Sequence, residues 1–174
     1  VHSNGLTLAR RVLLGDSMEE QKSRVNDYEE FLGQTLGEAL LEPTRIYVKP
    51  VMEMLDSGID LKAMVHITSG GFCNLNRVEC DNIRFVIDTL QPVPEIFNLI
   101  QDRGGVSEAE MFEVFNMGTG FCLVVEGTNE VEAVTEICKN NDLSCQLIGQ
   151  VEGCQGKEVS LPQKQLTGKG SRFT

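Results

Sequence analysis

The sequence predicts an α/β fold in which a mixed, largely antiparallel sheet is layered with helices. Short runs rich in β-branched and aromatic residues, such as 62–67 and 83–87, alternate with segments whose apolar residues recur at helical spacing. Several connections between these segments are too short for the crossover of a parallel pair, which favours antiparallel neighbours over a strictly parallel, doubly wound sheet. The chain has 174 residues, 41% of them apolar and 24% charged, so it can form one domain with a sizeable core.

The first part of the chain is predicted to be helical with polar connections. Apolar side chains recur at helical spacing in residues 6–14, and Ser3 and Asn4 are suitable N-cap residues before them. Residues 16–30 are polar and acidic, which indicates a loose connection or an exposed helix. Residues 35–41 predict another short helix.

Strands and helices alternate in the remainder of the chain. Residues 44–48 are expected to be extended, and Pro50 suits the first turn of a helix that ends before Gly58. Residues 62–67 predict a strand that runs into the turn-forming residues 68–71. The later predicted elements are a strand over 83–87, helices over 94–104 and 108–115, a strand over 118–125, a helix from 129, and a closing pair of strands over 145–151 and 157–161. Residues 162–174 lack periodicity and are expected to form a flexible tail after a domain spanning 1–161.

The charge balance excludes two classes of partner. The chain carries 26 acidic and 15 basic side chains, a net charge of −11, which repels nucleic acid and anionic membranes. No uninterrupted apolar run approaches the roughly 18 residues of a membrane-spanning helix. A phosphorylated metabolite could still bind, but only at a local site that overrides the overall field.

The six cysteines do not have the spacing of a metal site. The sequence contains no C-x-x-C pair, and its two histidines are far apart. Several cysteines lie among apolar residues, where a free thiol behaves as a small hydrophobic group. We therefore expect reduced thiols, no bound metal and a cytoplasmic location.

Three short polar loops adjoin predicted element ends and could hold a ligand. They are residues 2–5, residues 68–72 and residues 116–120, and each contains glycine. Glycines allow a ligand to approach the backbone closely, and exposed N–H groups at such places attract phosphate. Each loop could instead be a structural turn, since glycine-rich turns are common. The residues alone predict an α/β domain with glycine loops suited to a phosphate.

Taken in order, several segments resemble one known family. They are His2-Ser3-Asn4-Gly5, Leu41-Glu42-Pro43-Thr44-Arg45-Ile46-Tyr47-Val48-Lys49, His66-Ile67-Thr68-Ser69-Gly70-Gly71-Phe72, Val93-Pro94-Glu95-Ile96-Phe97, Val106-Ser107-Glu108-Ala109-Glu110-Met111, Phe115-Asn116-Met117-Gly118-Thr119-Gly120 and Ile148-Gly149-Gln150-Val151. Over about residues 1–161 the chain resembles the C-terminal domain of phosphoribosylformylglycinamidine cyclo-ligase, the AIR synthetase of purine biosynthesis. The chain departs from the family at Ser69, where a third glycine is usual, and at residues 73–76, which lack the usual acid and proline.

The resemblance implies an ATP-dependent C–N ring closure. In the family, formylglycinamidine ribonucleotide is converted to aminoimidazole ribonucleotide, ADP and phosphate. ATP with Mg is bound mainly by an N-terminal domain, which also forms the homodimer interface and is absent here, so the chain alone is expected to be inactive. His2 is the candidate catalytic residue. The candidate residues for binding the phosphorylated ribonucleotide are Asn4, Gly5, Thr68, Ser69, Gly70 and Gly71, and no residue is expected to ligate a metal.

Two alternatives remain open at this point. The chain could belong to a sister enzyme, either formylglycinamidine synthase or the carbamoyl-dehydrating protein of hydrogenase maturation. It could also be a stand-alone small-molecule-binding α/β module. The first residue is Val1 rather than Met, which predicts that the chain was processed or is a piece of a longer protein, and so favours the enzymes.

Overall fold

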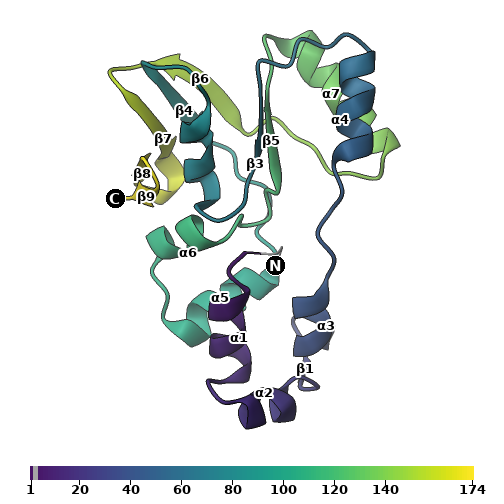
Figure 1. The fold of residues 1–174 in the computed structure, drawn as a ribbon, viewed down its shortest axis with the longest axis vertical. Helices are drawn as coiled ribbons and strands as arrows, with labels where there is room; N and C mark the ends of the chain where they lie inside the picture. The colour runs from purple at the N-terminus through teal and green to yellow at the C-terminus, as the bar shows by residue number, and fades with distance from the viewer. Residues whose placement is uncertain (2–3) are drawn as a thin grey trace.

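The computed structural model describes residue 1 and residues 4–174. Figure 1 shows a helical end and a strand-rich end, with the N-terminus lying between them. The helices at the helical end are α1 (Leu6–Leu14), α2 (Met18–Arg24), α3 (Leu36–Leu41) and α5 (Glu95–Gly104). At the other end, α4 (Val48–Asp56) and α7 (Thr128–Asn140) pack together beside the strands.

The strands form a mixed, largely antiparallel arrangement, which confirms the predicted fold class. β3 (Ala63–His66) pairs antiparallel with β5 (Phe121–Val124). A separate five-stranded sheet has the order β6 (Gly149–Gly153), β4 (Ile83–Ile87), β7 (Lys157–Leu161), β8 (Leu166–Lys169) and β9 (Arg172–Phe173). Only β4 and β7 pair in parallel in this sheet. The remaining elements are the two-residue strands β1 (Tyr28–Glu29) and β2 (Gln34–Thr35), the helix α6 (Glu108–Val114), and the 3₁₀ segments η1 (Gly71–Arg77) and η2 (Pro162–Lys164).

The predicted pairing of the last two strands is wrong. β6 and β7 do not pair with each other, because both flank β4, one antiparallel and one parallel. β6 also begins at Gly149 rather than near Cys145. Periodicity identifies a strand but does not identify its neighbour, so proximity in sequence misled the prediction here.

The prediction of a flexible tail is also wrong. The last residues form β8 and β9, which extend the five-stranded sheet and bury Leu166 and Phe173. Thr167 and Thr174 exchange backbone hydrogen bonds of 2.9 and 3.0 Å, and the Phe173 N–H donates to Glu113 Oε1 at 2.6 Å. Strands of four and two residues are too short to produce a recognisable alternation, so the tail is ordered by long-range contacts.

Two local predictions also need correction. The N-cap of α1 is Gly5, at φ +78°, and not Asn4; Ser3, the other N-cap candidate, lies outside the described residues. Residues 44–47 form no regular strand, and Val48 already begins α4. Elsewhere, α4, α5 and β4 lie where the sequence predicts them.

The main core lies where α1, α5, α6, η1 and the five-stranded sheet meet. Its largest fully buried side chains include Phe72, Phe112 and Phe115, and Phe97 packs on Phe115 with ring centroids 5.4 Å apart. A smaller apolar cluster around Met54, Val134 and Cys138 joins α4 to α7.

An ion pair across the parallel strands predicts acid sensitivity. Arg84 on β4 lies opposite Glu158 on β7, and Arg84 Nη2 is 2.5 Å from Glu158 Oε1. The hydrogen bond from Arg84, opposed in part by desolvation, lowers the pKa of Glu158 below its ordinary 4.5. Because the folded-state pKa is depressed, this stabilisation is present above the unfolded value and is lost as pH falls through the folded value.

We therefore expect Glu158→Gln to lower the free energy of unfolding by about 1 kcal/mol at pH 7, with the difference shrinking towards zero below pH 4 or so. Urea denaturation of both chains across this pH range measures the difference. A gap that stays constant from pH 7 to pH 3 would show that packing, and not charge, accounts for the loss.

Candidate functional site

The three polar loops singled out in the sequence meet in the structure. Asn4, Thr68 and Asn116, one from each loop, line a single small pocket. The apolar side of this pocket is formed by Ile67, Phe97 and Phe115, which connects it directly to the main core. The pairing of β3 with β5 brings two of these loops together, because one follows β3 and the other precedes β5.

Backbone hydrogen bonds fix the loops against one another. The Ile67 N–H donates to the Gly120 carbonyl at 2.9 Å, and the Gly70 N–H donates to the Glu113 carbonyl at 2.9 Å. In the loop before β5, the Gly118 N–H donates to Asn116 Oδ1 at 3.2 Å. The loop after β3 is therefore attached both to the end of α6 and to the loop that follows it.

Asn74, a residue of η1, fixes the loop after β3 through side-chain hydrogen bonds. Its Oδ1 accepts from the Thr68 N–H at 2.9 Å and from the Thr68 hydroxyl at 3.0 Å, while its Nδ2 donates to the Ser69 carbonyl at 2.9 Å. The side chain is only 1% exposed. Sequence reasoning missed this positioning residue, because an asparagine six residues after Thr68 belongs to no recognisable turn pattern.

Gly71 has a packing role that the sequence-based interpretation did not anticipate. It is buried with φ +51°, and a Cβ there would lie 1.7 Å from the Phe112 carbonyl oxygen. The missing side chain of Gly71 thus leaves room for the backbone of α6. Gly5 is similar, with φ +78° and a Cβ position 2.3 Å from the Phe115 ring. Both glycines therefore have a core-packing role, and their part in binding stays a prediction.

The other predicted site residues lie at the surface of the same loops. Thr68, Gly70 and Asn4 are half-buried, and Ser69 is exposed. Gly70 has φ +99°, and a Cβ there would lie 2.6 Å from Asn74 Nδ2. His2 lies outside the described residues. The structure thus groups Asn4 with Thr68–Gly70, and it adds Asn74 and Asn116 to the group.

Comparison with known proteins identifies the family of this domain. The family described as AIR synthase related protein, C-terminal domain, matches residues 1–162. The chain belongs to this family.

Curated relatives of this AIR synthase domain carry one name. The chain is 42% identical over 152 residues to the phosphoribosylformylglycinamidine cyclo-ligase of Methanococcus maripaludis strain C7, covering 87% of this chain and 41% of the relative. It is 44% identical over 153 residues to the enzyme of Methanocaldococcus jannaschii, with the same shares covered. With the Bacillus licheniformis enzyme it shares 44% over 158 residues, 90% of this chain and 44% of the relative. The chain thus spans about two fifths of the length of these cyclo-ligases.

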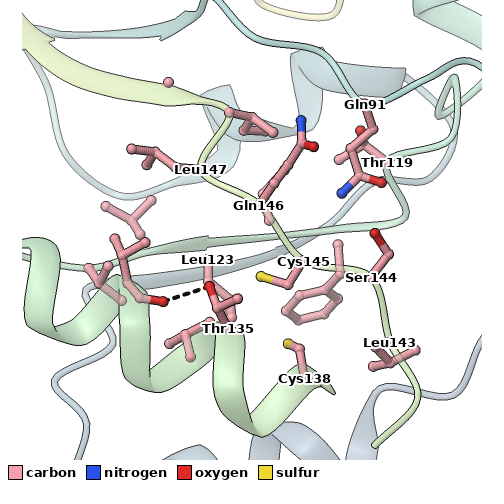
Figure 2. Close-up of a pocket in the computed structure, with 18 of the residues that line it drawn as sticks. Gln91, Thr119, Leu123, Thr135, Cys138, Leu143, Ser144, Cys145, Gln146 and Leu147 are labelled. Carbon is pink, nitrogen blue, oxygen red and sulfur yellow. Dashed lines mark hydrogen bonds between the residues drawn. The ribbon is translucent and has the colours of Figure 1, made fainter. Parts of the chain in front are cut away.

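A second, much larger cavity lies in the strand-rich half of the AIR synthase domain. It has a volume of about 870 Å³ and is open to solvent between β5 with α4 and α7 on one side and β4 with β6 on the other. Gly118, Thr119 and Gly120 line its edge, so the loop before β5 touches both this cavity and the small pocket. Figure 2 shows its inner wall, where Thr135, Cys138 and Cys145 lie together.

The thiols of this wall differ in acidity. Burial raises the pKa of Cys122 on β5 to about 12. The interaction between the neighbouring thiols of Cys138 and Cys145 raises the pKa of Cys138 and lowers that of Cys145, and the nearby Thr135 hydroxyl also lowers the latter. Each cysteine of the chain, all within residues 4–174, carries a free thiol.

The described residues contain neither a metal-ligand cluster nor a membrane-spanning helix. Residue 1 and residues 4–174 contain no group of three or more His, Cys, Asp or Glu side chains placed to hold a metal ion. Within the same residues, no helix is long and apolar enough to cross a membrane.

Proposed function

We propose that this domain forms one wall of the substrate groove in a phosphoribosylformylglycinamidine cyclo-ligase. The reaction closes the imidazole ring of formylglycinamidine ribonucleotide with ATP, giving aminoimidazole ribonucleotide, ADP and phosphate. The observation that carries the proposal is the meeting of Asn4, Thr68 and Asn116 at one pocket in a domain of this family. The name shared by the relatives supports the reaction, and no observation favours a sister enzyme or a stand-alone module.

The residues of this wall are suited to binding and orienting a phosphorylated ligand. The Ser69 side chain is exposed, and the guanidinium of Arg77 reaches the same loop, with Nη2 3.4 Å from the Ser69 carbonyl oxygen. In a chain with a net charge of −11, this cation provides a local attraction for an anionic group. Amide groups of Asn4 and Asn116 can donate to phosphate or carbonyl oxygens. Fixed placement of the reacting nitrogen near the formyl carbon is the main contribution such a wall makes to ring closure.

The described residues contain no group of three or more His, Cys, Asp or Glu side chains that could hold a metal ion, and no step of the reaction is assigned here to residues binding ATP with Mg. The family resemblance assigns the nucleotide mainly to another domain. The 174-residue chain by itself is accordingly expected to form no aminoimidazole ribonucleotide.

Thr68→Val tests the proposal. The change removes one hydroxyl at nearly constant volume, and we expect it to weaken the binding of formylglycinamidine ribonucleotide about tenfold in a full-length cyclo-ligase carrying this domain. Isothermal titration calorimetry measures the affinity, and a turnover assay on the same protein measures the rate. Thr167→Val, a threonine on β8 in the five-stranded sheet, is the matched control and should leave both unchanged. Equal affinity for wild type and Thr68→Val would contradict the placement of the loop after β3 in the groove. Product formation by the isolated chain would contradict the assignment of the nucleotide site to another domain.

A further inference from the structure

Three thiols gather at the large cavity, away from the proposed groove. Cys122 on β5, Cys138 in the last turn of α7, and Cys145 in the segment 141–148 all line it. Figure 2 shows Cys138 and Cys145 on the same stretch of the wall, one from the helix and one from the segment that follows. The remaining cysteines, Cys73, Cys80 and Cys154, do not line this cavity.

The backbone explains why Cys145 returns to Cys138. The carbonyl of Cys138 accepts from the Asn141 N–H at 3.0 Å and from the Leu143 N–H at 2.9 Å. These bonds fold the segment back over the end of α7, so that Cys145 lies against the helix it has just left. Cys138 is buried, with 7% of its surface exposed, whereas Cys145 is half-buried beside an open cavity. Cys145 is therefore the more exposed of the two residues, and it packs against the apolar cluster that contains Cys138.

We propose that Cys145 is a peroxide-reactive modification site and that Cys138 is its resolving thiol. In the first step the Cys145 sulfur attacks one peroxide oxygen, the O–O bond breaks, and a sulfenic acid and one water form. In the second step the Cys138 sulfur attacks the sulfenic sulfur, the S–O bond breaks, and a disulfide and a second water form. Two thiols lose two electrons and two protons in total, and one hydrogen peroxide is reduced to two waters.

The surroundings of these three thiols favour oxidation of Cys145 over metal binding. The described residues offer no metal-binding group that includes these thiols. The lowered pKa of Cys145 increases its thiolate fraction, and the thiolate is the nucleophilic form. Cys122 is buried with a raised pKa, so it is a bystander. The titrating groups coupled to Cys145 are thus Cys138 and Cys122, and the neighbouring Thr135 hydroxyl donates to the Val131 carbonyl at 2.7 Å. None of these three groups carries a fixed charge.

The disulfide would change the shape of the cavity wall. It would tie residues 141–145 to the end of α7, and the same segment continues into β6 at the edge of the five-stranded sheet. Oxidation would then fix a wall that is otherwise held through the two backbone bonds to Cys138 and the side-chain amide of Asn141, which donates to Glu53 and to the Ile137 carbonyl. The inference does not depend on the proposed ring-closing function.

Thiol mapping of the 174-residue chain tests the assignment. The reduced chain is treated with one equivalent of hydrogen peroxide, the remaining thiols are blocked with N-ethylmaleimide, and tryptic peptides are analysed by mass spectrometry. Trypsin cuts after Arg103, Lys139 and Lys157, so a 138–145 disulfide joins peptide 104–139, which also holds Cys122, to peptide 140–157, which also holds Cys154. Fragment-ion spectra of the linked pair then identify which two sulfurs are joined. We expect this linked pair to form, to disappear on treatment with dithiothreitol, and Cys145 to be oxidised at least about fivefold faster than Cys80.

Variants separate the two steps. In Cys138→Ser the disulfide cannot form, and the sulfenic acid on Cys145 should be trapped by dimedone. Cys80→Ser and Cys154→Ser are matched controls that should leave the linked pair unchanged. A disulfide between other cysteines, or oxidation of Cys145 no faster than Cys80, would overturn the proposal. Cys138→Ser alters a buried position, so the map of the wild-type chain tests the proposal independently of this variant. In urea, where the fold is lost, Cys145 should be oxidised no faster than Cys80.

Discussion

Replacing Gly71 with alanine is expected to lower the free energy of unfolding by about 3 kcal/mol or more, a large share of the roughly 5–15 kcal/mol that stabilises a typical domain. Two costs combine at this position. The residue has φ +51°, which costs an L-residue about 1–2 kcal/mol. The new Cβ would also lie 1.7 Å from the Phe112 carbonyl oxygen, a backbone atom of α6 that cannot move alone. Urea denaturation followed by circular dichroism measures the loss.

Two other glycines separate these costs. Gly105, at φ +56°, has nothing within 4 Å of its Cβ position, so Gly105→Ala reports the backbone strain alone. Gly149 lacks a left-handed φ, but its Cβ would lie 1.8 Å from the Val86 carbonyl oxygen, so Gly149→Ala reports a backbone clash alone. We expect Gly105→Ala to cost about 1 kcal/mol, and Gly71→Ala to exceed it by at least about 2 kcal/mol. Equal losses at Gly71 and Gly105 would contradict the packing role of Gly71.

A glycine-rich loop can resemble a ligand site when its glycines in fact allow close packing within the protein. The turn after β3 has the composition of a phosphate-binding loop, and residue chemistry alone could not separate that interpretation from a structural turn. In the structure Gly71 and Gly5 let helix α6 and the Phe115 ring approach the loops closely. The contribution of these glycines to a groove is thus to place the polar neighbours, Thr68 and Asn4, beside one another.

The sequence predicted the local elements well and the long-range pairing poorly. Helices such as α5 and α7 have several turns of apolar periodicity, and β4 is rich in β-branched and aromatic residues, so their residues identify them. The position of β4 between β6 and β7, and the ordering of β8 and β9, depend on contacts between residues far apart in sequence. No local pattern carries that information.

The residues of the candidate site also fall into those that local sequence signals marked and those that they did not. Glycine and hydroxyl residues at element ends marked the loops, and the order of the segments along the chain indicated the family, which the comparison confirmed. Asn74 gave no such signal, because its partners are fixed by the way η1 packs beneath the loop. The roles in binding of Asn4, Thr68, Ser69 and Gly70 stay predictions.

Replacing Asn74 with alanine should affect both stability and binding. The change removes the partner of the Thr68 N–H and leaves the Ser69 carbonyl with only the longer bond from Arg77. Because the lost side chain is only 1% exposed, we expect a loss of about 2–3 kcal/mol in the free energy of unfolding. Because the loop after β3 loses its hydrogen bonds to Asn74, the affinity of the folded protein for formylglycinamidine ribonucleotide should fall about tenfold. Denaturation of the chain and calorimetry on a full-length cyclo-ligase carrying it measure the two effects.

Asn76→Ala is the matched control, because Asn76 is the same residue type on the same 3₁₀ segment but faces the opposite way. Its Nδ2 donates to the carbonyls of Gly168 and Gly170, at 3.3 and 3.1 Å, so it holds η1 to β8 and the turn after it. We expect Asn76→Ala to cost about 1 kcal/mol of stability and to leave the affinity of the folded protein unchanged. Asn74→Asp keeps the acceptor for Thr68 but sets a carboxylate against the Ser69 carbonyl, so its effects should resemble those of Asn74→Ala. If Asn74→Ala and Asn76→Ala weakened binding equally, the loss would reflect a generally loosened η1, and Asn74 would have no positioning role at the groove.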